Sequence, residues 1–327
     1  MLMLVWASSA LADRCLFVDS ALETRPAAAT GPTKVNLRLY VNDIVSINDV
    51  DQSFTSDVVF RAEWHDSRLR HGNPMLCRAA MDQIWTPDLQ LLNLRTVKRI
   101  REPELSVFPD GSVRFLVRSF GDFSFRANLS DFPFDKQELS FNIVSTYSPD
   151  EVRLAAPWEK LGINDQLSVA NWKIELRGAR HLSHHIPPAD KYLERTDLVL
   201  EATRLTGYYT WQQLLPLLLV VMMTSIVFWI PTEVIPSRVG LAATSMLTLI
   251  AYRFAMSSIL PPIAYLTRLD IFMVGASVIV FAGLATTVAV SYLIDHQSEE
   301  LASSVNRAAR WLLPVLILLL TVFAFYA

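Results

Sequence analysis

The feature that most constrains this chain is an abrupt change in hydropathy near Thr210. Four long apolar stretches lie after this residue, whereas the sequence before it alternates between apolar and polar side chains. A bilayer core needs about 20 mostly apolar residues per helix. Each apolar stretch is therefore predicted to cross a membrane once, and the chain is predicted to contain one domain in water and one in lipid.

The domain boundaries follow from the same change. We expect a signal peptide at residues 1–12, because the apolar N-terminus ends in the small residues of Ala10-Leu11-Ala12; a short core segment is the alternative. An extracellular domain would cover residues 13–207 and a transmembrane domain residues 208–327, with helices at about 208–230, 238–260, 270–294 and 309–327. An exported N-terminus and four crossings place both termini on the outer side of the membrane.

Composition excludes several functions. The 29 basic and 32 acidic residues are nearly balanced and form no basic run, so nucleic-acid binding is not expected. Cys15 and Cys77 are too few for a tetrahedral zinc site, although one disulfide stays open. The chain has no nucleophile elbow, no Walker loop and no H-E-x-x-H motif. We therefore expect no enzymatic activity, no cofactor and no metal site.

The first domain is predicted to be an antiparallel β-sandwich. The runs from Val35 to Val41 and from Phe123 to Ser130 alternate between apolar and polar residues, which indicates half-buried strands. Pro109-Asp110-Gly111-Ser112 lies between two further runs and has the composition of a hairpin turn. Strands that recur at short intervals favour a sandwich of the immunoglobulin-like kind.

Seven motifs stand in an order that resembles the pentameric ligand-gated ion channels, the Cys-loop receptor superfamily. The most specific is the signature loop, residues 128–137, Asn-Leu-Ser-Asp-Phe-Pro-Phe-Asp-Lys-Gln. The other six are the turn Ser46 to Gln52, the W-x-D-x-R-L-like strand Trp64 to Leu69, the W-x-P-D-like segment Ile84 to Leu89, the pre-helix Thr203-Arg204, the second membrane helix Pro236 to Leu249, and the loop Leu260 to Thr267.

The resemblance implies a homopentameric ring around a central pore, in a plasma (inner) membrane, gated by a small-molecule agonist or by protons, with monovalent ions and membrane lipid as its other partners. Two departures resemble bacterial members. The family's two loop cysteines fall on Phe125 and Leu139, so an apolar contact would replace their disulfide, and the second cytoplasmic segment is short.

The second membrane helix carries more polar residues than a helix surrounded by lipid needs. At helical spacing one stripe runs from small and polar residues to apolar ones, and a ring of such helices would wet the lumen at one end and close it by dewetting further along. Packing between helices is the alternative. The stripe is Gly240, Thr244, Leu247, Ala251, Phe254 and Ser258.

Ion selectivity is predicted to be set at the cytoplasmic mouth, beside Arg238. Pro236 and Ser237 resemble the anion-conducting animal members, whereas Glu233 offers a carboxylate ring and the bacterial members favour cations. We expect cation conduction from Glu233. Arg253 lies about one turn from the outer end of the helix, where snorkelling and a pore or subunit contact are both open.

Gating is predicted to pass through a charge cluster. By resemblance, Asp49 of the first turn, Asp135 of the signature loop and Arg204 before the first helix form a buried trio, near which Pro133 and Pro262 would meet. An arginine between two carboxylates would hold the domains in register, and loss of one partner would cost roughly 3 to 5 kcal/mol. Three unrelated surface charges are the alternative.

The agonist pocket is expected between subunits. The family's aromatic positions fall on Leu92, Thr146 and Val59, which leaves Tyr147 and Tyr192 as the aromatic faces for an amine, and Arg61 and Arg118 on the complementary side. His181, His184 and His185 lie in the capping hairpin, so a proton-linked gate is open beside a solvated histidine-rich loop. The rival function is a membrane-anchored periplasmic binding or sensor module without conductance.

Overall fold

The computed structural model describes residues 17, 19–26, 31–99, 103–257 and 262–326. The predicted signal peptide, Cys15, Pro261 and Ser258 of the pore stripe lie outside the described residues. The chain forms two compact units. The first comprises Met1–Asn48, Gln52–Ala127 and Gln137–Ala202, and the second comprises Asp49–Asp51, Asn128–Lys136 and Thr203–Ala327.

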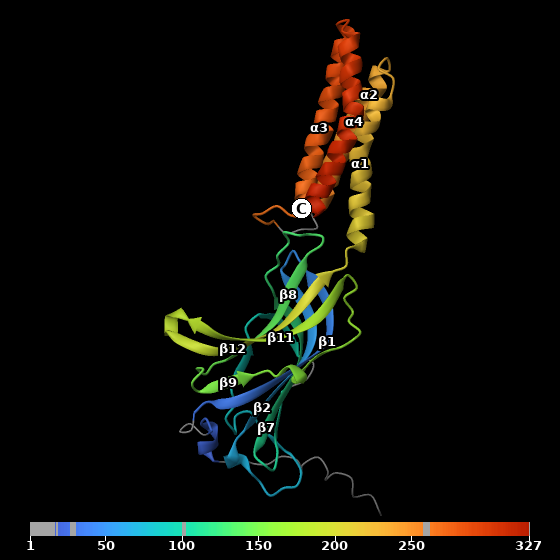
Figure 1. Ribbon diagram of the computed structural model, residues 1–327. Coiled ribbons are helices and arrows are strands. Elements are labelled where there is room, and N and C mark those ends of the chain that lie inside the picture. Colours follow the sequence, from blue (N-terminus) through green and yellow to red (C-terminus); the bar gives the residue numbers. More distant parts are fainter. Residues whose placement is uncertain (1–16, 18, 27–30, 100–102, 258–261, 327) are drawn as a thin grey trace, which may run out of the picture. The chain divides into compact units, whose positions relative to one another are not determined.

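The first unit is a β-sandwich, as the alternating pattern predicts (Figure 1). One sheet has eight strands, in the order β10-β1-β2-β7-β6-β3, with β5 on β7 and β9 on β1; the other has the order β11-β12-β8-β4. The strands are β1 (Thr33–Asn48), β2 (Ser53–His65), β3 (Cys77–Ala79), β4 (Leu89–Leu91), β5 (Leu94–Arg99), β6 (Glu104–Val107), β7 (Ser112–Ser124), β8 (Lys136–Ser145), β9 (Val152–Ala155), β10 (Leu161–Ile163), β11 (Trp172–Ile186) and β12 (Lys191–Arg204).

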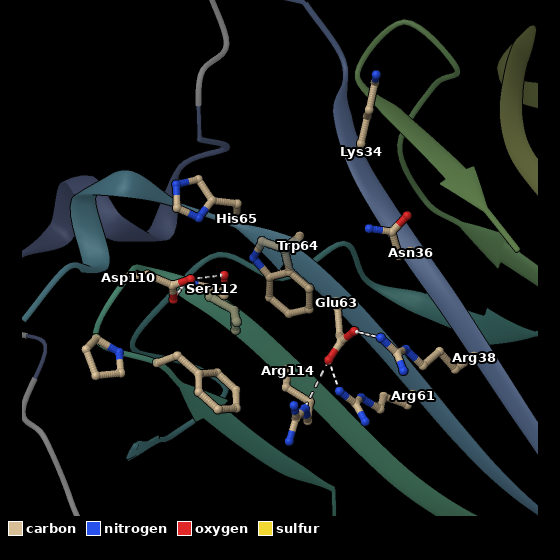
Figure 2. Close-up of a pocket in the computed structure, with 13 residues that line it drawn as sticks. Lys34, Asn36, Arg38, Arg61, Glu63, Trp64, His65, Asp110, Ser112 and Arg114 are labelled. Carbon is tan, nitrogen blue, oxygen red and sulfur yellow. Dashed lines mark hydrogen bonds and ion pairs between the residues drawn. The ribbon is translucent and has the colours of Figure 1, made fainter. Parts of the chain in front are cut away.

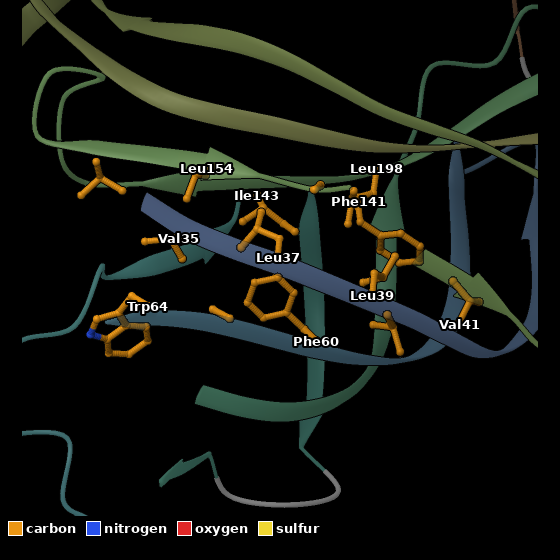
Figure 3. Close-up of a cluster of buried hydrophobic side chains, with 14 of the residues drawn as sticks. Val35, Leu37, Leu39, Val41, Phe60, Trp64, Phe141, Ile143, Leu154 and Leu198 are labelled. Atoms are coloured by element: carbon orange, nitrogen blue, oxygen red, sulfur yellow. The ribbon is translucent and has the colours of Figure 1, made fainter. Parts of the chain in front are cut away.

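The core of the sandwich is built from the inward positions of these strands. Val35, Leu37, Leu39 and Val41 of β1 are all at most 3% exposed, and Figure 3 shows them beside Phe141 and Ile143 of β8. Because side chains alternate along a strand, the residues between them point to the other face of the sheet. The outward face of β1, β2 and β7 is therefore free to carry polar side chains.

The predicted hairpin turn is present. Gly111 adopts a positive φ of 84°, and the Phe108 amide donates to the Ser112 carbonyl over 2.8 Å. A side chain at position 111 would collide with the Asp66 carbonyl, so glycine serves both the backbone conformation and the close approach.

The second alternating run, from Phe123 to Ser130, is only partly a strand. β7 ends at Ser124, yet the alternation of burial continues through buried Phe125 and Leu129. The prediction of a strand over the whole run is wrong, because periodicity reports which side chains are buried and not whether the backbone is paired. Phe125 and Leu139 lie in one buried apolar cluster, in place of the family's cysteine pair. Cys77 is disulfide-bonded.

The second unit contains four helices long and apolar enough to cross a membrane, counted over the described part of the chain. The first combines a π-helical turn (Tyr209–Leu214), α1 (Leu215–Ile226) and a 3-10 turn (Val227–Trp229). The others are α2 (Ile235–Ser257), α3 (Arg268–Asp295) and α4 (Glu299–Tyr326), and Figure 1 shows α3 and α4 side by side.

The helix ends have local causes. Thr267 and Asp270 form a capping box that starts α3. α4 begins at Glu299, well before the expected start near residue 309, because its first turns are amphipathic and not apolar. Ala302, Asn306 and Ala309 recur at helical spacing and are buried, while acidic residues occupy the first turn, where the helix dipole favours them.

Candidate functional site

The structure brings Asp49, Asp135 and Arg204 together within the second unit. The Arg204 guanidinium donates from Nε to Asp135 Oδ1 over 2.7 Å, and from Nη2 to Asp135 Oδ2 over 3.0 Å and to Asp49 Oδ2 over 2.8 Å. The arginine and Asp135 side chains are about 2% and 1% exposed, and that of Asp49 is 12% exposed. The arrangement is a buried charge triad, so the interpretation as three unrelated surface charges is wrong.

Neighbouring groups set the charge state of the triad. Burial opposes the charge of Arg204, but its hydrogen bonds to Asp135 and the two negative charges outweigh burial and raise the pKa of the guanidinium. Burial raises the pKa of Asp49 above its ordinary value of 3.8, because its attraction to Arg204 does not fully compensate. Asp49 Oδ1 is buried and has no hydrogen-bond partner among the described residues. The charge of Asp49 is thus less well compensated by Arg204 than its burial requires.

The signature loop is held by residues at the start of α3 and just before it. The Tyr265 hydroxyl accepts from the Leu129 amide over 2.9 Å, and Arg268 pairs with Asp131 over 2.8 Å. Pro133 of the signature loop is buried, whereas Pro262 is exposed. The expected meeting of Pro133 with the proline loop stays a prediction.

An aromatic pair joins the triad to the first membrane helix. The rings of Phe132 and Tyr209 lie 5.0 Å apart, and the Arg204 guanidinium stands 5.0 Å above Phe132 and 5.5 Å from Tyr209. Because a cation over an aromatic face is attracted to it, Arg204 links the signature loop with the residue that begins the helix.

α2 has two contrasting faces. One face packs inside the helix bundle through Ala242, Ser245 and Leu249, which are buried. The described members of the predicted stripe are all exposed: Gly240, Thr244, Leu247 (69%), Ala251 and Phe254 (75%). The Thr244 hydroxyl donates to the Gly240 carbonyl of its own helix. Its oxygen can therefore still accept a hydrogen bond from water or coordinate a cation.

The cytoplasmic mouth differs from expectation at one residue. Glu233, Pro236 and Ser237 are exposed, but Arg238 is fully buried. Its guanidinium donates to Asn306 of α4 and lies 5.8 Å from the Phe228 ring. The expectation that Arg238 flanks the mouth is therefore wrong for a single chain, since its side chain turns into the bundle.

The predicted aromatic faces of the agonist pocket lie at one end of the two central strands of the four-stranded sheet, just after β8 and at the start of β12. The Trp85 indole donates to the Tyr147 hydroxyl over 2.9 Å, with the two rings 5.5 Å apart. Lys191 Nζ donates to the Thr146 carbonyl over 2.8 Å, and Tyr192, the next residue of β12, is 53% exposed. Leu92 follows β4 and is 41% exposed.

The tip of the β11–β12 hairpin carries a histidine stack. The rings of His185 and Tyr192 lie 4.6 Å apart at 26°, and His185 Nε2 is 3.3 Å from Asp190 Oδ1. His181 is further along β11, where its Nδ1 lies 3.0 Å from the Thr196 hydroxyl. The ring of His185 thus lies against the ring of Tyr192.

The complementary residues lie on the other sheet. Val59 and Arg118 are cross-strand partners on β2 and β7, and Arg118 is paired with Asp57 over 2.5 Å. Hydrogen bonds from Arg118 lower the pKa of Asp57. Arg61 instead pairs with Glu63. The two predicted halves of the pocket therefore occupy different sheets of one chain, and a pocket between subunits stays a prediction.

The sequence analysis missed the role of two residues here. Trp85 was placed only in a family motif and Lys191 was not singled out, and the stacking of His185 on Tyr192 was not predicted although both residues were named. The adjacency of Lys191 and Tyr192 in an exposed hairpin is a signal for the first, but ring stacking across a hairpin tip depends on strand register, which the sequence does not give.

Comparison with known proteins agrees with these motifs. Residues 14–186 match the model of the neurotransmitter-gated ion-channel ligand binding domain, and residues 213–317 match that of the neurotransmitter-gated ion-channel transmembrane region.

Among curated proteins, the chain is 27% identical over 279 residues to the human gamma-aminobutyric acid receptor subunit gamma-3, covering 82% of this chain and 59% of that protein. It is 27% identical over 300 residues to the human subunit epsilon and 30% identical over 300 residues to the Caenorhabditis elegans subunit beta, covering 88% of this chain in both cases, and 58% and 54% of those proteins. The chain thus spans less than two thirds of each of these relatives.

Proposed function

The chain belongs to the neurotransmitter-gated ion-channel family, and we propose that it is a ligand-gated ion channel whose pore is lined by α2. Five copies would form a ring in a plasma (inner) membrane, with both termini on the outer side. Heterologous contacts between identical subunits close into such rings when the rotation per subunit divides the circle.

The observation that carries this proposal is the exposed stripe on α2. Leu247 and Phe254 are among the most exposed large apolar side chains of the chain's described part, and they share their face with Gly240 and Thr244. A helix that merely anchored a sensor would have little use for a stripe that changes from small and polar to bulky and apolar. In a ring the same stripe supplies a wet end and a dewetting gate.

We place the agonist between subunits, where Tyr147 and Tyr192 of one copy would face Val59, Arg61 and Arg118 of the next. The relatives are named for gamma-aminobutyric acid, and aromatic faces suit a small amine. Protons are a second trigger, supported by His185, which is stacked on Tyr192 and lies near Asp190.

The permeant ions are proposed to be monovalent cations. Glu233 is exposed just before the start of α2, whereas Arg238, the basic residue nearest to it in the sequence, is buried and donates to Asn306. An exposed carboxylate repeated around a ring attracts cations. The Pro236-Ser237 pair resembles anion-conducting members and is the feature that favours anion conduction.

Current recording tests the proposal directly. The full chain would be expressed in oocytes or reconstituted in a bilayer, the external pH stepped from about 5 to 9, and small amines then applied. We expect a gated current whose reversal potential in asymmetric salt follows the cation. Absence of current under all of these conditions, with surface protein confirmed, would favour the sensor module, and a reversal potential that follows chloride would overturn the cation assignment.

A further inference from the structure

The proposed agonist pocket contains a primary amine that belongs to the chain itself. Lys191, the first residue of β12, donates from its ammonium Nζ to the Thr146 carbonyl over 2.8 Å. Thr146 lies just after β8 and precedes Tyr147, and Tyr192 directly follows Lys191. The ammonium is therefore bound at a carbonyl next to one of the two aromatic residues assigned to an amine, and it comes from the residue next to the other.

The contact at Thr146 differs from the one beside it. The carbonyl of Tyr147 accepts from the backbone amide of Glu194 over 3.3 Å, and a backbone amide is fixed by its strand. Lys191 instead reaches Thr146 through a flexible stem that carries three N–H donors. Another N–H donor can therefore replace the ammonium at Thr146 without unpairing the backbone.

Solvent keeps this contact weak. Lys191 is exposed, and the adjoining Tyr192 is 53% exposed. Fixing a long side chain costs rotamer entropy, and the net gain from an exposed charged contact is small because water competes for both partners. A ligand from solution therefore has little to overcome when it displaces the ammonium.

The surroundings of the ammonium favour a positive charge. The Ser148 amide and hydroxyl donate to Glu151 over 3.0 and 2.9 Å. These hydrogen bonds lower the pKa of the Glu151 carboxyl, and the charge of Lys191 adds to the effect. Glu151 is therefore ionised at neutral pH, and its charge attracts any cation that takes the place of Lys191.

The arginines of the other sheet are held by a carboxylate. Glu63 contacts Arg61, and it lies 3.0 Å from Arg38 Nη2 and 3.1 Å from Arg114 Nε (Figure 2). Within the described part of the chain, the Lys191 ammonium donates to a neutral carbonyl. Hydrogen bonds between two ionised groups are the stronger kind, so of these four cations Lys191 is the one that a ligand replaces most readily.

We propose that Lys191 is a built-in competitor for amine agonists, a role that rests on the proposed function in which a small amine binds beside Tyr147 and Tyr192. The ammonium of Lys191 holds the Thr146 carbonyl until an amine with N–H donors displaces it and forms the same hydrogen bond. Quaternary ammonium ions carry no N–H donor and gain nothing from the freed carbonyl. Lys191 therefore sets how well the pocket distinguishes primary amines from quaternary ones.

Calorimetric titration of the purified full-length protein with propylamine and with tetramethylammonium tests the proposal. Lys191→Met has a side chain of similar length without charge or donors. In this variant the ratio of propylamine affinity to tetramethylammonium affinity should rise about fivefold, because the freed carbonyl serves only propylamine. Lys191→Arg keeps charge and donors and should leave the ratio at the wild-type value. Lys173→Met is the matched control, since Lys173 is a surface lysine of β11 paired with Glu175 over 2.7 Å.

The ratio separates displacement from general electrostatics. Removal of a positive charge strengthens the binding of both cations alike, so an equal gain for the two ligands, or no gain, would overturn the role of Lys191. An equal rise in Lys173→Met would do the same. Binding is measured without current, so the two proposals fail separately. A conducting channel with an unchanged ratio overturns only the displacement, whereas a raised ratio without any current supports the displacement and counts against conduction.

Discussion

Arg204 is shared unequally between its two carboxylates. Asp135 receives two hydrogen bonds from the guanidinium and is 1% exposed, whereas Asp49 receives one and leaves a buried oxygen without a partner in the described structure. One positive charge cannot neutralise two negative ones, and Asp135 raises the pKa of Asp49 as well. The two aspartates should therefore respond differently to neutralisation.

We predict that Asp135→Asn destabilises the protein by about 3 kcal/mol, because it breaks the better half of a buried ion pair. Asp49→Asn should change stability by less than about 1 kcal/mol, since the lost attraction is offset by relief of desolvation and of repulsion from Asp135. The measurement is the melting temperature of the purified protein, read as loss of the monodisperse chromatographic peak on heating. Equal losses for the two variants would contradict the unequal sharing.

Asp49 makes the stability of the protein depend on pH, and the sign of that dependence is known. A carboxyl whose pKa is higher in the folded than in the unfolded chain holds more protons when folded, so its contribution to stability falls as pH rises through the interval above 3.8. The wild type loses this contribution to stability as pH rises, whereas Asp49→Asn has no carboxyl at this position and does not lose it. The melting temperature of Asp49→Asn relative to the wild type should therefore be higher at pH 7 than at pH 4, and a constant difference would refute the assignment.

How far single residues could be predicted depended on whether their motif was contiguous. Asp49, Asp135 and Arg204 were found because each stands in a short recognisable motif, although 155 positions separate the first from the last. Arg238 was misjudged for the opposite reason. Its place at a helix end suggests exposure, and only the packing of α2 against Asn306 of α4 shows that it is buried.

At the scale of the element, α2 is a helix with one packed face and one exposed face. Leu247 and Leu249 are two residues apart and share chemistry and volume, but they are 69% and 2% exposed. Residues two apart on a helix point to different sides. This pair offers a matched test of which face lines the pore.

We predict that Leu247→Ser lowers the agonist concentration for half-maximal current by about tenfold, equal to about 1.4 kcal/mol, because a hydroxyl eases wetting of the gate. Leu249→Ser should instead reduce the amount of folded protein, since it buries an unpaired hydroxyl in the bundle. Both are measured by current recording alongside surface labelling. Unchanged or lower sensitivity in Leu247→Ser would count against the gate.

Elements were predictable where periodicity and burial coincide. The four apolar stretches yielded four helices, and the alternation around Val35 yielded β1. The start of α4 was missed, because its first turns bury Ala302 and Asn306 and not long apolar side chains. The end of β7 was missed, because alternation of burial outlasts strand pairing beyond Ser124.

At the scale of the whole molecule, the sequence conceals what distant strands assemble. Arg38, Glu63 and Arg114 stand on three strands, and their meeting depends on a register that no local pattern reports. Alternation does predict that each of them points outward, so a basic face was within reach of the sequence. The contacts of Arg38 and Arg114 with Glu63 could not be predicted from the sequence. The proposed agonist pocket poses the same problem between copies of the chain.

A ring of copies multiplies the effect of one charge, which makes Glu233 a test of the whole assembly. We predict that Glu233→Gln reduces the preference for cations, because the change removes one carboxylate from every subunit at the mouth. The reversal potential in asymmetric sodium chloride should move toward zero. Glu299→Gln is the control, since Glu299 is an exposed acidic residue in the first turn of α4. An equal shift in both variants would point to general surface charge, and no shift in Glu233→Gln would remove this residue from the selectivity mechanism.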